Sequence, residues 1–259
     1  MRLFILTCLT LLIISPVTTN AFQSVKATTH ALDHATIQRR RLVLVRSSAL
    51  VGDRSFKKRA VVVYPVISGL DASILGRVRS LLNFKNIFDY SLTEYKEDTW
   101  LDEFSYQVNH NGNYLLDITF NQSGSAAYPD DQSKHFLINL KTGRIVAAAD
   151  AFETKAHATL AAMVNKKLKA ELKQIAQELK ESTNDPEDAR IASEAQEPLE
   201  FKPENLEDFS VSSKGVTFLY DAGYPHAIQA FQPNGKYFFS YAELKPFIRR
   251  DGPLGQFIQ

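Results

Sequence analysis

Apolar and polar positions follow strand and helix periodicities along most of the chain from residue 60 onward. Residues 60–66 form a short apolar, β-branched run that is typical of a strand buried on both faces. The next segment repeats apolar residues at helical spacing, so it predicts a helix that begins near Asp71 or Ser73. The apolar side of that helix holds Ile74, Leu75, Val78, Leu81 and Leu82.

Two hairpins are predicted after this helix. Alternating apolar residues lead to the pair Asn111-Gly112, and residues 114–120 return as the second strand. Asn-Gly is a strong hairpin signal because both residues tolerate positive φ. A second alternation ends at Leu140, directly before the turn residues 141–144. This part of the chain therefore predicts antiparallel strands.

The longest predicted helix covers residues 154–181, and the chain ends in a β-rich unit. The helix has apolar residues three or four apart, with lysines on its other faces. Residues 209–212 and 215–220 predict paired strands, and residues 241–248 predict a short helix interrupted by Pro246. Together these elements predict an α+β fold, with antiparallel sheet or sheets, helices packed on one face and one long amphipathic helix in the middle of the chain.

The first 21 residues have the organisation of a cleavable signal peptide. Arg2 precedes an apolar run over residues 3–14, Ser15-Pro16 breaks it, and Ala21 ends a stretch of small residues at the expected cleavage site. The run is shorter than the roughly 20 residues that a membrane span needs, and no later segment is apolar enough. We therefore expect an exported, soluble protein, periplasmic or extracellular, without a transmembrane segment after signal cleavage.

Composition divides the remainder into four parts. Residues 22–59 carry nine basic residues against two acidic ones and predict a basic, flexible arm; the alternative is a solvated linker with one edge strand at residues 42–45. Residues 60–181 are expected to form an N-terminal α+β subdomain. Residues 182–205 are acidic and proline-containing, which predicts a linker or long loop. Residues 206–259 are expected to form a C-terminal β-rich subdomain with a short terminal helix.

Charge and cysteine content narrow the classes of function. The net charge of +1 gives no electrostatic case for binding nucleic acid. The single cysteine, Cys8, lies in the predicted signal, so the mature chain forms no disulfide and depends on its packed core. An apolar content of 44% is ample for such a core.

Residues that carry chemistry are sparse. Glu97-Asp98 and Asp130-Asp131 are adjacent acids, which in an extended chain point to different sides and usually only make a loop soluble. His30 and His34 are four apart but lack a third ligand or a His-Glu-x-x-His pattern. Neither Gly-x-Ser-x-Gly nor a phosphate-binding glycine loop occurs. The sequence therefore predicts no catalytic residues, no metal site and no cofactor.

Two aromatic turns are the best candidates for ligand contact. In each, a tyrosine stands beside a rigid proline and polar groups, and tyrosine gives a large contact area at modest entropic cost. The alternative is that both tyrosines are partly buried core residues with satisfied hydroxyls. The predicted ligand-binding residues are Tyr128, Pro129, Asp130, Asp131, Tyr224 and His226.

Three segments together resemble a bacterial extracytoplasmic family: residues 64–70 with the helix after them, residues 90–152 and residues 209–247. This family pairs a deacetylase-associated N-terminal region with a C-terminal domain of unknown function. Its members occur as anti-sigma factor ectodomains and beside cell-wall polysaccharide deacetylases. The resemblance implies an α+β fold and a binding role, with peptidoglycan fragments or lysozyme-type proteins as ligands. This chain has Ala127-Tyr128-Pro129 where many members have a histidine-containing turn, and it lacks the deacetylase and anti-sigma domains.

We therefore expect a non-catalytic binding module of the bacterial cell envelope that recognises a cell-wall glycan or an envelope protein partner. Two alternatives remain open. The chain is an inhibitor of lysozyme-type wall-degrading enzymes if one of its loops enters the enzyme's cleft. It is a wall-modifying hydrolase if peptidoglycan turnover depends on Asp130 or Asp131.

Overall fold

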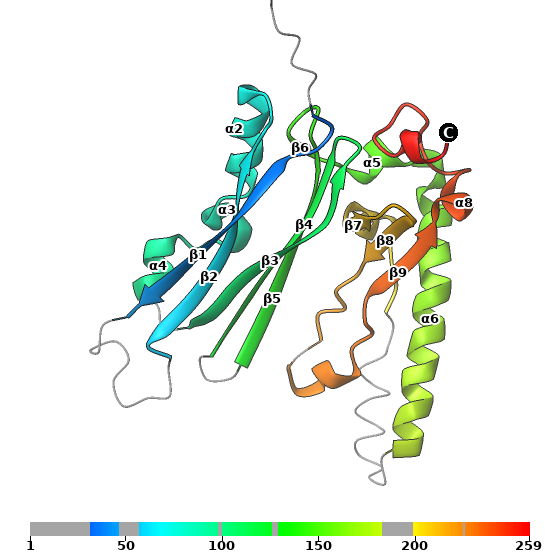
Figure 1. The fold of residues 1–259 in the computed structure, drawn as a ribbon. Helices are drawn as coiled ribbons and strands as arrows, with labels where there is room; N and C mark the ends of the chain where they lie inside the picture. The colour runs from blue at the N-terminus through cyan, green and yellow to red at the C-terminus, as the bar shows by residue number, and fades with distance from the viewer. Residues whose placement is uncertain (1–31, 47–56, 98–99, 126–128, 183–198, 225) are drawn as a thin grey trace, which may run out of the picture. The chain divides into compact units, whose positions relative to one another are not determined.

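The computed structural model describes residues 32–46, 57–97, 100–125, 129–182, 199–224 and 226–259, and within them it shows an α+β fold with two β-sheets (Figure 1). The predicted signal peptide and the expected linker residues 183–198 lie outside the described residues, as does Tyr128. None of the helices described is long and apolar enough to cross a membrane.

The first sheet contains six strands in chain order, which are β1 (Thr36–Val45), β2 (Arg59–Ser68), β3 (Leu101–Gly112), β4 (Leu115–Ser125), β5 (Pro129–Asn139) and β6 (Arg144–Ile145). Neighbouring strands are antiparallel except β2 and β3, which pair in parallel. A parallel pair needs a crossover connection. Helices α2 (Ala72–Leu81), α3 (Phe84–Phe88) and α4 (Leu92–Glu97) provide it and cover one face of the sheet (Figure 1). Of these, only α2 was predicted.

Strand β1 corrects the expectation of a flexible arm for residues 36–45, whereas residues 22–31 and 47–56 of that expected arm lie outside the described residues. The strand pairs with β2 along its whole length, so the alternative of an edge strand is confirmed and extends well beyond residues 42–45. The strand pattern is hidden in the sequence because three consecutive arginines, Arg39, Arg40 and Arg41, stay exposed at the edge of the sheet. Leu44 is buried against the core, and this burial holds the end of the strand.

The β3–β4 hairpin turns two residues later than the sequence predicts. Strand β3 continues through Gly112, and the turn residues are Asn113 and Tyr114, with φ of 53° and 55°. Two successive positive φ values are typical of the tight turn that matches the twist of a hairpin. Asp33, just before β1, accepts hydrogen bonds from both amides: its carboxylate from Asn113 at 3.2 Å and its carbonyl from Tyr114 at 2.7 Å. A contact distant in sequence thus helps to fix the turn.

Strands β4 and β5 contribute to two hydrophobic cores at once. Successive side chains of a strand point to opposite faces of the sheet. Ile118 and Phe136 enter the first core beneath α2, α3 and α4, whereas Leu115 and Leu137 on the other face enter the second core. The same two faces continue along the whole sheet. We call the second one, which α2, α3 and α4 leave uncovered, the open face.

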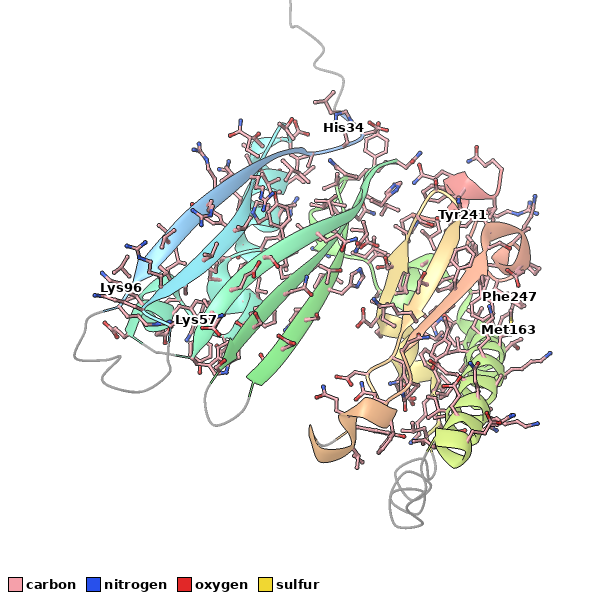
Figure 2. The ribbon with its side chains drawn as sticks, turned by 60° about the horizontal axis from the view of Figure 1, so that its bottom comes forward. His34, Lys57, Lys96, Met163, Tyr241 and Phe247 are labelled. Atoms are coloured by element: carbon pink, nitrogen blue, oxygen red, sulfur yellow. The ribbon has the colours of Figure 1, made fainter. Side chains whose placement is uncertain are left out.

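The second sheet consists of β7 (Phe209–Val211), β8 (Gly215–Leu219) and β9 (Lys236–Ser240), and the long helix α6 (His157–Ser182) packs against it (Figure 1). Leu160, Val164 and Leu168 of α6 are fully buried, which confirms the predicted long amphipathic helix. Figure 2 shows Met163, Tyr241 and Phe247 in this part of the chain. The short elements are α5 (Ala148–Ala151), α8 (Tyr241–Leu244), η1 (Thr154–Ala156), η2 (Pro203–Glu207), η3 (His226–Phe231) and η4 (Gly255–Phe257).

The division of the chain differs from the expected subdomains. Helix α6 was assigned to the N-terminal subdomain, but its apolar side lies in the core of the C-terminal sheet. The end of the expected linker is also part of that core, because Phe201 is fully buried. Asn165 of α6 holds Phe201 by accepting a hydrogen bond from its amide at 2.8 Å and donating one to its carbonyl at 2.6 Å. The core of the second sheet therefore includes α6 and, before it, α5 and η1.

Candidate functional site

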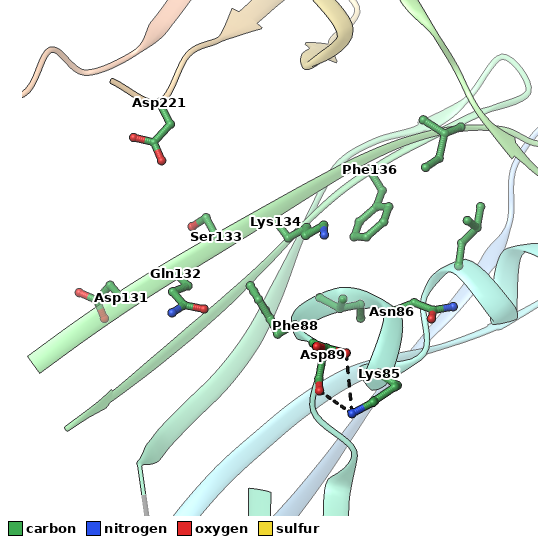
Figure 3. A pocket seen from close by; sticks show the side chains of 13 residues that line it. Lys85, Asn86, Phe88, Asp89, Asp131, Gln132, Ser133, Lys134, Phe136 and Asp221 are labelled. Carbon is green, nitrogen blue, oxygen red and sulfur yellow. Dashed lines mark hydrogen bonds and ion pairs between the residues drawn. The ribbon is translucent and has the colours of Figure 1, made fainter. Parts of the chain in front are cut away.

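A groove of about 890 Å³ runs along the outer edge of β5 (Figure 3). Residues 131–134 of β5 form its floor, and α3 with Asp89 forms one wall. Asp221, which follows β8, lies on the other side. The groove is thus built by the first sheet, the crossover helices and the segment that follows β8. Its size is within the range of about 300–1,000 Å³ that is usual for ligand sites.

The first predicted turn leads directly into this groove. Pro129 and Asp130 are the first residues of β5, and Asp131 is an exposed residue that lines the groove. Tyr128 lies outside the described residues. Of the first turn, Asp131 is therefore the residue that the structure places in a candidate site.

The second predicted turn reaches the groove indirectly. Tyr224 does not line it, and burial of its ring raises the pKa of Tyr224. Its hydroxyl is buried without a hydrogen-bond partner among the described residues. The Tyr224 amide donates to the Gln232 side chain at 3.2 Å, and Gln232 donates to Asp221 at 3.1 Å, so the turn helps to hold Asp221. His226 begins η3.

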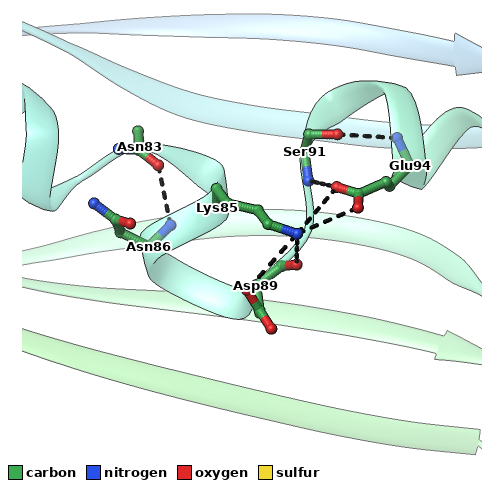
Figure 4. A network of polar contacts seen from close by, with 6 residues as sticks. All are labelled: Asn83, Lys85, Asn86, Asp89, Ser91 and Glu94. Carbon is green, nitrogen blue, oxygen red and sulfur yellow. Dashed lines mark hydrogen bonds and ion pairs between the residues drawn. The ribbon is translucent and has the colours of Figure 1, made fainter.

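Helix α3 is held at the groove by local polar contacts (Figure 4). Asn83 caps the helix by accepting a hydrogen bond from the Asn86 amide at 3.0 Å. Lys85 reaches the carboxylate of Glu94 at 3.2 Å, and the Ser91 amide donates to the same carboxylate at 2.6 Å. Hydrogen bonds from the Ser91 backbone, the Ser91 hydroxyl and Lys85 lower the pKa of Glu94 to about 2. These contacts fix the short helix that forms one wall.

Replacing Asn83 with Ala is expected to lower the free energy of unfolding by about 1 kcal/mol, because the cap of α3 is lost. Urea unfolding at neutral pH measures this. The Asn83→Ser variant is the matched control, since a serine hydroxyl keeps a capping acceptor, and we expect it to lose less than half as much. Equal losses in the two variants would contradict the assigned capping role.

The open face beside the groove is polar. Glu103, Ser123 and Asp131 are register neighbours across β3, β4 and β5, and so are Ser105, Asn121 and Ser133. The Ser133 hydroxyl donates to the Asn121 side chain at 2.6 Å. Glu103, Ser105, Asn121 and Asp131 are among the residues that line a surface depression on this face. Their hydroxyl, amide and carboxylate groups lie at regular strand spacing and can bind hydroxyl-rich or peptide ligands.

At the other end of the open face, a network of charged groups around the buried Asp117 joins the two sheets. Asp117 of β4 is fully buried and accepts hydrogen bonds from the His135 ring at 2.9 Å and from the Val211 amide of β7 at 2.6 Å. Asn109 donates to the same carboxylate at 2.7 Å. The other ring nitrogen of His135 lies 2.8 Å from Asp208, whose carboxylate is half exposed. The network links β4 and β5 to β7.

The protonation state of His135 follows from this geometry. Burial alone would lower its pKa, but hydrogen bonds to Asp117 and Asp208 and the charges of both carboxylates outweigh burial and raise the pKa to about 9. His135 therefore carries a positive charge at neutral pH. A protonated imidazole between two carboxylates has no lone pair to act as a base, so this arrangement connects the sheets structurally.

Asp117, Asp208 and Asp221 are not among the residues that the sequence predicts to bind a ligand. The one available signal was an acid within the apolar run Leu115-Leu116-Asp117-Ile118, since a charge buried in a strand needs partners. Its partners come from β5 and β7, far away in sequence, and only the fold reveals them. Among the described residues, no group of three or more His, Cys, Asp or Glu side chains has the arrangement of a metal site.

Comparisons with known proteins find similarity in the fold but not in the sequence. No protein-family model matches the chain, and no curated protein sequence matches it. A solved DUF3298 family protein from Bacteroides fragilis NCTC 9343 is similar in structure, with a TM-score of 0.50 and 13% identity over 86% of this chain and 96% of that one. A DUF3298 family protein from Pseudomonas aeruginosa PAO1 gives a TM-score of 0.47 and 11% identity over 84% and 94%. The likeness to the Bacteroides protein supports the expected α+β fold.

Proposed function

We propose that this chain is an exported, non-catalytic binding module of the bacterial cell envelope and that its ligand site is the groove along β5. The observation that supports the proposal most strongly is the meeting of Asp131 and Asp221 in one groove, although they are 90 residues apart in the chain. A cell-wall glycan or a segment of a protein partner both offer the polar groups that the groove and the open face can bind.

The proposal predicts that retention of the ligand depends on charge in the groove. Immobilised protein is mixed with bacterial envelope extract and, separately, with muropeptides, and the retained material is identified. Changing both Asp131 and Asp221 to Lys is expected to reduce retention about tenfold or more, because the groove loses two hydrogen-bond acceptors for ligand hydroxyl, amide or ammonium groups. The control changes Glu178 and Glu204 to Lys, since these two exposed acids lie outside the groove.

Retention that is lost only in the groove variant supports the proposal, whether the retained ligand is a muropeptide or a protein. A retained lysozyme-type enzyme makes inhibition of that enzyme the next assay. Equal retention by both variants removes the groove from consideration. Failure of the wild-type protein to retain any ligand contradicts the binding-module proposal itself.

A wall-modifying hydrolase is the second candidate, and one observation favours it. Glu103 and Asp131 are two strands apart in one row of the open face, which separates their backbones by about 10 Å. Inverting glycoside hydrolases hold their two carboxylates about 6.5–9.5 Å apart. Both side chains are exposed, however, whereas the acid of such a pair usually lies in a desolvated pocket.

Turnover of purified peptidoglycan distinguishes the two candidates. The hydrolase predicts release of soluble muropeptides that stops in the Glu103→Gln and Asp131→Asn variants. The binding module predicts no release by the wild-type protein. Release that depends on both carboxylates would overturn the non-catalytic assignment.

A further inference from the structure

The outer edge of β5 presents backbone groups that no neighbouring strand uses. The Leu137 carbonyl accepts a hydrogen bond from the Val146 amide at 2.9 Å, on the side of β5 away from β4, whereas the Leu140 amide donates to Tyr114 at 2.8 Å, toward β4. Backbone groups alternate between the two sides of an antiparallel strand, and the pairing of β4 with β5 has no register shift. The N–H and C=O groups of Asp131 and Ser133 therefore point outward, into the groove.

These outward groups have room for a partner. Strand β6 pairs only with Ile138 and Asn139, at the far end of β5. Within the described part of the chain, the outward backbone groups of Asp131 and Ser133 make no backbone hydrogen bond. An open strand edge of this kind is a template for strand addition.

Side-chain hydrogen bonds anchor the strand edge to β4 and α4. Gln122 of β4 is buried and donates to the Gln132 side chain at 2.7 Å. Tyr95 of α4 donates to the same Gln122 at 2.5 Å. A pre-ordered edge lowers the entropic cost of pairing with an extended segment.

The two walls of the groove differ in chemistry, and each would meet alternate side chains of an added strand. On the helix side, the lining side chains include the apolar Leu81, Phe88 and Phe136 together with the lysines Lys85 and Lys134. On the side of the open face they are the Ser133 hydroxyl and the carboxylates of Asp131 and Asp221. Figure 3 shows Phe88 and Phe136 on the helix side of β5, and Asp221 opposite them.

We propose that the outer edge of β5 binds an extended peptide segment of a partner protein by strand addition, and that this segment alternates apolar and basic residues. Apolar residues pack against Leu81 and Phe88, and basic residues face Asp131 and Asp221. The peptide backbone pairs with the outward groups of Asp131 and Ser133. This inference rests on the proposed binding function and specifies its partner class.

The geometry favours a single peptide segment over a second copy of the chain. The outer edge of β5 lies between α3 on one side and Asp221 on the other. Pairing β5 with β5 of another copy would bring a second α3 and a second Asp221 into the same space. A lone extended segment has no such walls of its own.

The test uses the purified protein and fluorescein-labelled seven-residue peptides that alternate Lys and Val, or Glu and Val, followed by fluorescence anisotropy. We expect the Lys/Val peptide to bind at least about tenfold more tightly than the Glu/Val peptide. Ser133→Pro is expected to weaken binding of the Lys/Val peptide about tenfold, since proline removes an outward N–H without removing a bond to β4. Ser133→Ala is the matched control, because it loses the same hydroxyl contact and keeps the N–H. Circular dichroism confirms that both variants fold.

The outcomes separate this inference from the proposed function. Tight Lys/Val binding that Ser133→Pro weakens and Ser133→Ala spares supports strand addition. If neither peptide binds while muropeptides do, the inference is wrong and the proposed function stands. A concentration-dependent dimer that Ser133→Pro abolishes would overturn the inference in favour of a second copy. Absence of peptide, muropeptide and envelope-protein binding would contradict both proposals.

Discussion

Replacing Asp117 with Ala is expected to lower the free energy of unfolding by about 3–5 kcal/mol. The substitution leaves three groups without their acceptor: the Val211 amide, the Asn109 side chain and the protonated ring of His135. Asp117 is fully buried, so water cannot replace the lost carboxylate without entering the core. The substitution also removes the hydrogen bond between Asp117 of β4 and Val211 of β7, which links the two sheets.

Urea or guanidinium unfolding at neutral pH measures this loss, and Asp208→Ala is the matched control. Asp208 contacts the same imidazole, but its carboxylate is 58% exposed, so water can solvate the ring after the change. We expect the control to lose about 1 kcal/mol or less. A similar loss in both variants would show that the buried carboxylate is not the main link between the sheets.

Stability is expected to fall by about 3 kcal/mol as the pH rises from about 6.5 to about 9, through the deprotonation of His135. The folded protein holds this proton up to a pKa of about 9, whereas the unfolded chain releases it near 6.5. The stabilisation is therefore fully present below pH 6.5, declines between the two pKa values and is absent above the higher one. Histidine protonation thus stabilises the contact between the sheets at neutral pH.

The measurement is a series of unfolding curves between pH 6 and pH 9.5 for the wild-type protein and for His135→Gln. The variant keeps a polar side chain but cannot gain a proton, so its stability should vary less with pH across this window. It should also be less stable than the wild type at pH 6 and closer to it at pH 9.5. Parallel profiles for the two proteins would mean that the His135 proton is not linked to folding.

The sequence predicted those elements that local periodicity determines. The apolar side of α6 repeats over several turns, and its buried residues Leu160, Val164 and Leu168 are those of the predicted side. Strands β7 and β8 were also found within one or two residues. Strand β1 was predicted only in part, as the alternative of an edge strand at residues 42–45, because consecutive arginines interrupt its alternation and its partner β2 supplies the missing half of the pattern.

The candidate site was less accessible to prediction because it depends on contacts distant in sequence. Asp131 was predicted from its own turn, but the position of Asp221 opposite it follows from the packing of the second unit. The open edge of β5 has only a general sequence signal, since Pro129 and the charged residues after it suit an edge strand but do not show how far β6 covers it. The edge of β5 stays open because β6 is short and pairs only with Ile138 and Asn139.

Amide chemical shifts of the ¹⁵N-labelled protein test most directly whether ligands bind in the groove along β5. Muropeptides and the Lys/Val peptide are titrated in separate experiments. We predict that the largest shifts for a bound ligand occur at Asp131, Gln132, Ser133 and Asp221, along the groove. Shifts confined to the edge of β1, or no shifts with either ligand, would contradict the assignment of the β5 groove as the binding site.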